Sequence, residues 1–133
     1  MLGIVASSSA LAECRGGTSE ILKVSDFNAR VVDSYYSEVV ELSITIENIS
    51  DYDVRMLDGR IIFNDVLGRS IDNLSLHEDA RIPNNDTYTQ VGAYSALGSK
   101  NITRLATADA SDIIAIICVE GLVTTEGGIY RFD

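Results

Sequence analysis

The chain has 133 residues, a size typical of one domain, and its 46% hydrophobic and 23% charged residues exclude the disordered and collagen-like classes. Its 20 acidic and 10 basic residues give a net charge of −10, which repels phosphate backbones and anionic lipid surfaces alike. We therefore expect no nucleic-acid partner, and we interpret the acidic surface as one that keeps the protein soluble.

The first twelve residues resemble an export signal. The stretch LGIVA is apolar, and Ala10-Leu11-Ala12 has the small-x-small pattern that a signal peptidase recognises. The apolar stretch is shorter than the roughly 20 residues that span a membrane, and no basic residue precedes it. We interpret residues 1–12 as the remnant of a longer signal peptide and residues 13–133 as one domain, periplasmic or secreted.

The two cysteines are Cys14 and Cys118, and Cys14 has three candidate roles: a lipid-bearing residue, half of a disulfide, or a buried thiol. A lipoprotein signal places a small residue directly before the modified cysteine, whereas this chain has Glu13, so we expect no stable membrane anchor. In an exported protein an even cysteine count favours oxidation, and a single intramolecular bridge is available. The alternative is that Cys118, in the apolar run IIAIICV, is a buried thiol.

Strand patterns dominate the first half of the mature chain. ILKVSDFNARVV predicts a first strand with a bend at Ser25 and Asp26, and the loop DSYYSE follows it. In EVVELSITIENIS, apolar and polar residues alternate from Val40 to Glu47, the period of a strand with one buried face. VRMLDGRIIFND alternates in the same way, and we expect it to pair antiparallel with the preceding strand. The turn DVLGR and a strand from Ser70 to Leu76 would complete a meander.

The second half continues this pattern. Pro83 and the following NND predict a turn, and Thr87 to Val91 is typical of a strand. SALGSKNITRLATADAS is predicted as a loop with a helical turn around Thr103 to Ala108. Ile113 to Val119 is apolar on both faces, which predicts a central or covered strand. Periodicity alone leaves a helix open there, and the isoleucines and the following VTTEGGIYRF hairpin pattern favour a strand.

These segments predict an all-β fold, an antiparallel β-sandwich of six to eight strands. A single sheet would leave one apolar face in water, so two packed sheets are expected. The chain has no tryptophan, and its cysteines lack the separation that links the two sheets of an antibody domain. Both observations argue against a true immunoglobulin domain and leave an immunoglobulin-like relative open.

The stretch LSITIENISDYDVRMLDGRIIFNDVLGRSIDNLSL, residues 42–76, resembles the FxLYD-type modules of bacterial envelope and secreted proteins. Such modules have a strand that ends in Asn with a short Ser/Asp turn, then a strand of the form x-V-x-F-x-D, a Gly turn and another strand. This chain departs from the pattern at Phe63-Asn64-Asp65, where the modules have Leu-Tyr-Asp, and at Asn84, where they have Gly. The resemblance covers about a third of the chain and implies an immunoglobulin-like sandwich outside the cytoplasm, with no particular chemistry.

Candidate catalytic and metal-binding residues are few. His77 in LSLHEDAR is the one histidine, and no Gly-x-Ser-x-Gly motif marks a serine for it, so we interpret it as a solvated loop residue. RGGTS lacks the strand, helix and lysine of a phosphate-binding loop. We expect no catalytic residue, no cofactor and no metal ion. A Ca²⁺ site would require the fold to collect four turn aspartates, whose spacing matches no twelve-residue calcium loop: Asp51, Asp53, Asp58 and Asp65.

Tyrosines and asparagines supply the remaining candidate sites. Tyr35, Tyr36, Tyr88 and Tyr94 lie in or beside predicted loops, where tyrosine serves recognition or covers the end of a core. Both roles stay open, with Tyr35 and Tyr36 as the candidate partner contact. Four Asn-x-Ser/Thr triplets matter only if the source glycosylates its secreted proteins; they begin at Asn48, Asn73, Asn85 and Asn101.

The function hypothesis that follows is an exported, non-catalytic module with a protein-binding or structural role in the cell envelope. Its partner would be another envelope or secreted protein, and the sequence leaves the oligomeric state open. An alternative is a secreted inhibitor or toxin-neutralising protein that acts through Tyr35, Tyr36 and the acidic surface. A hydrolase that uses His77 is third.

Overall fold

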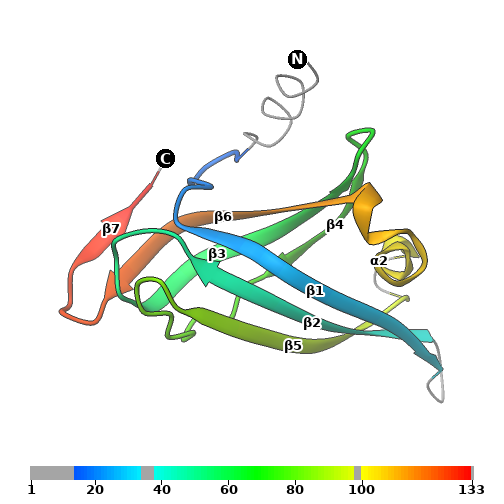
Figure 1. Ribbon diagram of the computed structural model, residues 1–133, viewed down its shortest axis with the longest axis horizontal. Coiled ribbons are helices and arrows are strands. Elements are labelled where there is room, and N and C mark those ends of the chain that lie inside the picture. Colours follow the sequence, from blue (N-terminus) through cyan, green and yellow to red (C-terminus); the bar gives the residue numbers. More distant parts are fainter. Residues whose placement is uncertain (1–13, 34–37, 98–99, 133) are drawn as a thin grey trace.

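The computed structural model describes residues 14–33, 38–97 and 100–132, and they form an all-β sandwich of two antiparallel sheets (Figure 1). One sheet has the strand order β1-β2-β5, and the other has the order β4-β3-β6-β7. The described strands number seven, within the predicted range of six to eight. Their bounds are β1 (Leu22–Asp33), β2 (Glu38–Asn48), β3 (Val54–Asp65), β4 (Ser70–Ser75), β5 (Thr87–Ser95), β6 (Ile113–Thr124) and β7 (Ile129–Arg131).

The strand order fits an immunoglobulin-like sandwich. In that architecture the first, second and fifth strands share one sheet, and the third, sixth and seventh share the other. The present chain divides these six strands in the same way, but its β4 lies beside β3 at the edge of the larger sheet, whereas the fourth strand of a constant-type domain lies beside the fifth. The chain therefore changes sheets after β2, after β4 and after β5.

The core lies between the sheets and is made by the apolar rows that the alternation predicts. Along β2 the inward row is fully buried, and Phe27 of β1 meets Phe63 of β3 edge to face across the core, with ring centroids 5.7 Å apart. The largest fully buried apolar side chains are Phe63, Leu22, Leu42, Ile44, Ile46, Ile61, Ile82, Ile102, Ile117, Val40 and Val54.

The predicted pairing of the second and third strands is wrong. β2 pairs with β1 and β5, whereas β3 pairs with β4 and β6 in the opposite sheet, so no meander forms. Alternation of apolar and polar residues shows only that each strand has one buried face. Two strands that face each other across the core have this pattern just as two strands paired in one sheet do. The turn-like ISDYD is thus an arch between sheets.

A buried side chain, Asn48, supports this arch. It is 0% exposed, and its Nδ2 donates to the carbonyl oxygens of Tyr52 at 2.7 Å and Ile82 at 2.8 Å. Its Oδ1 accepts from the backbone N–H and the hydroxyl of Ser50, at 2.9 and 2.7 Å. The amide therefore uses both donors and its acceptor to replace the ladder bonds that the chain gives up as it leaves β2.

Other sequence predictions are confirmed. β3 and β4 form the predicted hairpin, and β6 and β7 form the predicted terminal hairpin. The bend expected at Ser25 and Asp26 is a register shift between Val24 and Asp26. The predicted helical turn is α2 (Arg104–Thr107), which follows the 3₁₀ turn η1 (Lys100–Thr103) and precedes another, η2 (Ala110–Asp112). β6 is an internal strand of its sheet, as its two apolar faces predicted.

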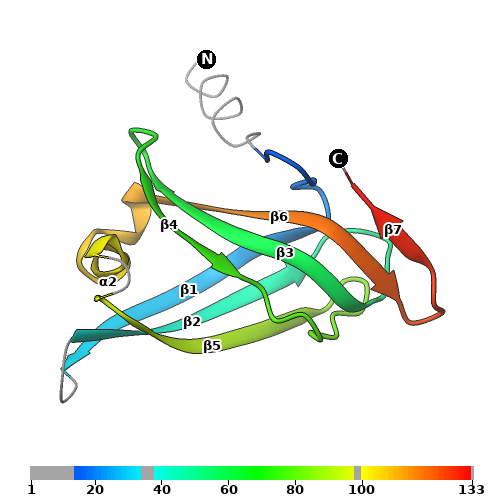
Figure 2. The ribbon, with the colours of Figure 1, turned by 180° about the vertical axis from the view of Figure 1, so that it is seen from behind.

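One side of the sandwich is closed by Gln90 of β5. This side chain is 1% exposed, its Nε2 donates to the carbonyl oxygen of Ser75 at 3.0 Å, and its Oε1 accepts from the backbone N–H of His77 at 2.9 Å. Helix α2 packs against β1 near the far end of β5 (Figure 2). None of the helices in the described residues is long and apolar enough to cross a bilayer.

Candidate functional site

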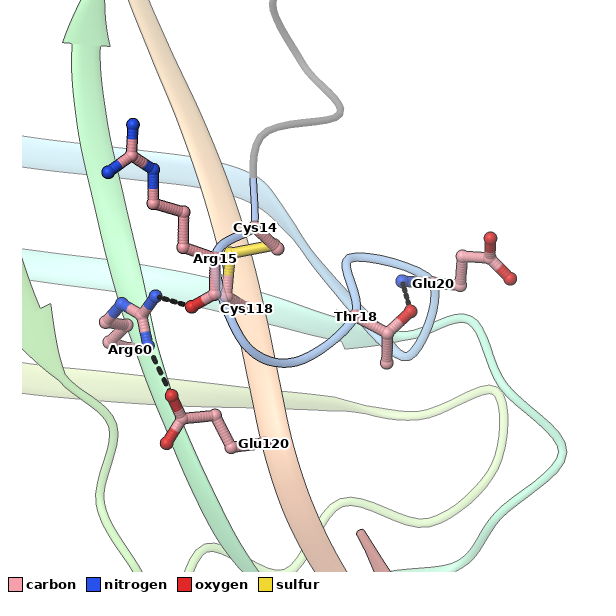
Figure 3. Close-up of a disulfide and its surroundings, with 7 residues drawn as sticks. All are labelled: Cys14, Arg15, Thr18, Glu20, Arg60, Cys118 and Glu120. Carbon is pink, nitrogen blue, oxygen red and sulfur yellow. Dashed lines mark hydrogen bonds and ion pairs between the residues drawn. A yellow bond between two sulfur atoms is a disulfide. The ribbon is translucent and has the colours of Figure 1, made fainter. Parts of the chain in front are cut away.

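The two cysteines form a disulfide, as predicted. Cys14 is joined to Cys118 of β6, with their Cα atoms 5.6 Å apart (Figure 3). Beside it, Thr18 and Val119 exchange both backbone hydrogen bonds at 2.9 Å, so the N-terminal segment is joined to β6 by one isolated β-bridge. We call residues 14–18 with the disulfide the N-terminal clasp.

Two glycines allow the clasp to lie this close to β6. Gly16 and Gly17 have φ values of 75° and 102°, where residues with side chains are strained. A Cβ on Gly17 would lie 2.7 Å from the carbonyl oxygen of Val119, which no side chain tolerates. The Gly pair of RGGTS thus serves a close approach between backbones.

An arginine joins the clasp to β3. The Nη2 of Arg60 donates to the carbonyl oxygen of Arg15 at 2.8 Å, and its Nη1 pairs with Glu120 of β6 at 2.8 Å (Figure 3). One half-buried guanidinium therefore bridges the clasp, β3 and β6 on the outer face of the larger sheet.

His77 is exposed, as predicted, and follows β4. Its Nδ1 lies 2.9 Å from the hydroxyl of Tyr88, and the two rings meet edge to face. In the described residues, the polar side-chain contact of His77 is this tyrosine of β5. The histidine therefore connects the end of β4 to the other sheet, and it is not placed between a serine and a carboxylate.

The tyrosines have different roles. Tyr88 and Tyr94 are half-buried and pack against the core, so they cover its margin. Tyr52 does the same at the arch, where its ring centroid lies 4.7 Å from that of Tyr130. Tyr35 and Tyr36, the candidate partner contact, lie outside the described residues.

The four candidate calcium aspartates are not gathered into one site. In the part of the chain that the structure describes, no group of three or more Asp, Glu, His or Cys side chains is arranged to hold a metal ion. Asp53 accepts the backbone N–H of Asn84 at 2.8 Å, the turn role predicted for these residues. Asp65 is instead a buried carboxylate at the centre of a polar network.

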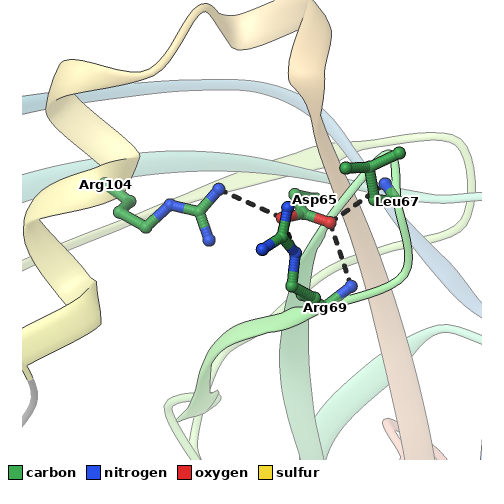
Figure 4. A network of polar contacts seen from close by, with 4 residues as sticks. All are labelled: Asp65, Leu67, Arg69 and Arg104. Carbon is green, nitrogen blue, oxygen red and sulfur yellow. Dashed lines mark hydrogen bonds and ion pairs between the residues drawn. The ribbon is translucent and has the colours of Figure 1, made fainter.

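The Asp65 network holds the turn between β3 and β4 (Figure 4). Asp65 is 4% exposed, and its Oδ1 accepts the backbone N–H groups of Leu67 and Arg69, both at 2.9 Å. Its Oδ2 lies 3.1 Å from Nη2 of Arg104 and 3.5 Å from Nε of Arg69. The hydrogen bond from the Arg69 backbone, with those from Arg104 and Leu67 and the charge of Arg69, lowers the pKa of the Asp65 carboxyl, although burial opposes the shift.

This network holds two apolar side chains in water. Val66 is 53% exposed and Leu67 is 75% exposed, and we call these two residues the hairpin tip. The N–H of Val66 donates to the carbonyl of Asp112 at 3.1 Å, and Gly68 closes the turn with a φ of 87°. Around the tip, the Arg69 side chain is 72% exposed and that of Arg104 is 40% exposed.

Sequence reasoning identified the turn DVLGR and missed the tip. A turn normally carries polar residues, so the pair Val66-Leu67 between Asp65 and Gly68 was the available signal. An exposed apolar pair on a turn whose backbone is already held suits protein contact, because binding need not order that backbone.

Comparisons with known proteins add little. No family model matches the chain, and no curated protein matches it. The chain is similar to a solved structure described as the X-ray structure of Northeast Structural Genomics Consortium target SoR45, at 15% sequence identity and a TM-score of 0.42. The match covers 86% of this chain and 83% of the other.

Proposed function

We propose that this protein is an exported, non-catalytic β-sandwich that binds another envelope or secreted protein through its hairpin tip. The observation that carries the proposal is the tip itself: Leu67 is 75% exposed on a turn whose backbone is fixed by the buried Asp65. An apolar pair held rigidly in water has an energetic cost that binding recovers.

Export is supported by the disulfide. Such bonds persist in oxidising compartments and are rare in the cytosol, and this one joins residues 104 positions apart. The resemblance to FxLYD-type modules agrees with this location. A non-catalytic role is supported by the engagement of the candidate acid–base groups, since His77 contacts Tyr88 and Asp65 holds the turn.

The partner's chemistry follows from what surrounds the tip. Two arginines, Arg69 and Arg104, share the carboxylate of Asp65 beside the apolar pair, and the exposed Asp112 adjoins Val66 through a backbone hydrogen bond. The partner should therefore offer an apolar pocket with charged groups of both signs on its border.

The test is site-specific photo-crosslinking of the full chain in its own compartment. With p-benzoylphenylalanine in place of Leu67, we expect a discrete protein adduct that is lost when Val66→Asp is added. The same photo-crosslinker in place of Ile129 is the matched control, because Ile129 is 73% exposed on β7 at the opposite end of the sandwich (Figures 1 and 2). Equal adducts from both positions, or an adduct that survives Val66→Asp, would contradict the proposal.

A further inference from the structure

The four edge strands of the sandwich differ in how they are protected against pairing with another chain. β4 and β7 are short, with six and three residues. β1 is long, but it carries a bulge and charged side chains, Lys23 and Arg30 among them. β5 has nine residues and an unbroken register with β2. It is also the one described strand without a charged side chain. Bulges, charges and shortness are the usual protections of an edge, and β5 has none of them.

The free backbone groups of β5 can be assigned from its pairing with β2. Just beyond the two ends of β5, Asn48 N–H donates to Asp86 O and Ala96 N–H donates to Glu38 O, both at 3.0 Å. The even-numbered residues therefore direct their backbone groups to β2, and the odd-numbered ones direct theirs away from it, because the direction alternates along a strand. In the described part of the chain, the backbone groups of Thr89, Val91 and Ala93 meet no hydrogen-bond partner.

The side chains on this edge are small and neutral. Thr89, Val91 and Ala93 are exposed on the outer face of the sheet, and Val91 is 66% exposed. β5 runs along the outer margin of the smaller sheet (Figures 1 and 2). Among the described residues, the edge thus offers a row of unpaired backbone groups, and the side chains of β5 itself carry no charge.

We propose that a second copy of this chain occupies the edge, with its β5 antiparallel to the first and a two-fold axis at Val91. In this register Val91 faces Val91, and Thr89 of each copy faces Ala93 of the other. Each pair exchanges two N–H···O bonds, as hydrogen-bonded pairs of an antiparallel ladder do. The two three-stranded sheets become one continuous sheet, and the contact is the same patch on both copies.

Charge favours a second copy at this strand. Two copies of net charge −10 repel each other, so they approach at least cost where each presents no charge. Two acidic side chains on β2, the strand beside β5, are already paired: Glu41 lies 2.6 Å from Arg30, and Glu47 lies 3.6 Å from Lys23. This inference goes beyond the proposed function, since it concerns a different surface from the hairpin tip.

Sedimentation equilibrium of the full chain over a range of concentrations tests the dimer. We expect wild type to pass from monomer to dimer, with tighter association at higher salt, because salt screens the repulsion. Val91→Lys puts two like charges opposite each other and should weaken association about tenfold or more. Val91→Pro removes an N–H directed at the free edge and should have the same effect without loss of a bond to β2.

The matched control is Ser43→Lys, because Ser43 lies beside Val91 in the register, on β2 rather than at the edge. It should dimerise like wild type. A wild-type monomer at all concentrations, or equal weakening by Ser43→Lys, would overturn the inference. The register is tested by Val91→Cys, because Cys14 and Cys118 are bonded to each other and the new thiol is free to react. It should crosslink two copies, and Ser43→Cys should not.

Discussion

The N-terminal clasp and the Asp65 network fasten the sandwich at two places by different chemistry. The clasp is covalent and adds a segment to β6, whereas the network is polar and holds the turn after β3. The first is sensitive to reduction, and the second is sensitive to acid. We therefore expect the clasp to stabilise the whole fold, and the Asp65 network to position one surface, the hairpin tip.

The largest expected effect comes from removing the covalent fastening. Cys14→Ser opens a loop of 104 residues and should lower the free energy of unfolding by about 4 to 5 kcal/mol in the chain-entropy model. Urea unfolding followed by circular dichroism measures it. Wild type with reductant should match the variant, and the variant should be unaffected by reductant. Equal midpoints for oxidised wild type and variant would show that the clasp adds no stability.

Two glycine substitutions compare the turn held by Asp65 with the N-terminal clasp directly. Gly68→Ala puts a side chain at a φ of 87° with no atom within 4 Å, so it should cost about 1 to 2 kcal/mol. Gly17→Ala has a similar strain and adds a contact of 2.7 Å with the Val119 carbonyl oxygen, so it should cost more. Thermal unfolding of both variants decides the order. A larger loss for Gly68→Ala would contradict the close approach at the clasp.

The smallest expected effect is the acid sensitivity of the network. The folded pKa of Asp65 lies below its ordinary value of 3.8, so its stabilisation is fully present above that value and is lost as the pH falls through the folded pKa. Unfolding midpoints measured from roughly pH 5 to pH 2 should fall less steeply for Asp65→Asn than for wild type. Leu67→Ala, which removes no ionisable group from the same turn, should keep the wild-type slope. An unchanged slope for Asp65→Asn would contradict this role.

The fold class and the disulfide could be predicted because both depend on local patterns. Alternation along β2 identified its buried row, and two cysteines behind an export-like segment allowed one bridge. The pairing of β2 with β3 was mispredicted, because alternation does not say which side of the core a strand takes. The arch depends on Asn48, which reads in the sequence as an ordinary turn residue.

The candidate surfaces were beyond sequence reasoning for a related physical reason. Thr87 to Val91 was predicted as a strand, but its position at a sheet edge follows from the sheet order, which is a property of the whole chain. Likewise, Val66 and Leu67 are held in place by Asp65, whose carboxylate contacts Arg104, a residue 39 positions later in the chain.

The span of the clasp also imposes an order on biosynthesis. Cys118 follows Cys14 by 104 residues, and it lies on β6, which must be made before the bond can close. The strands β1 to β5 all precede Cys118 in the chain, so they have been synthesised before the bond can close. An oxidised clasp therefore indicates that the chain has been made at least as far as β6.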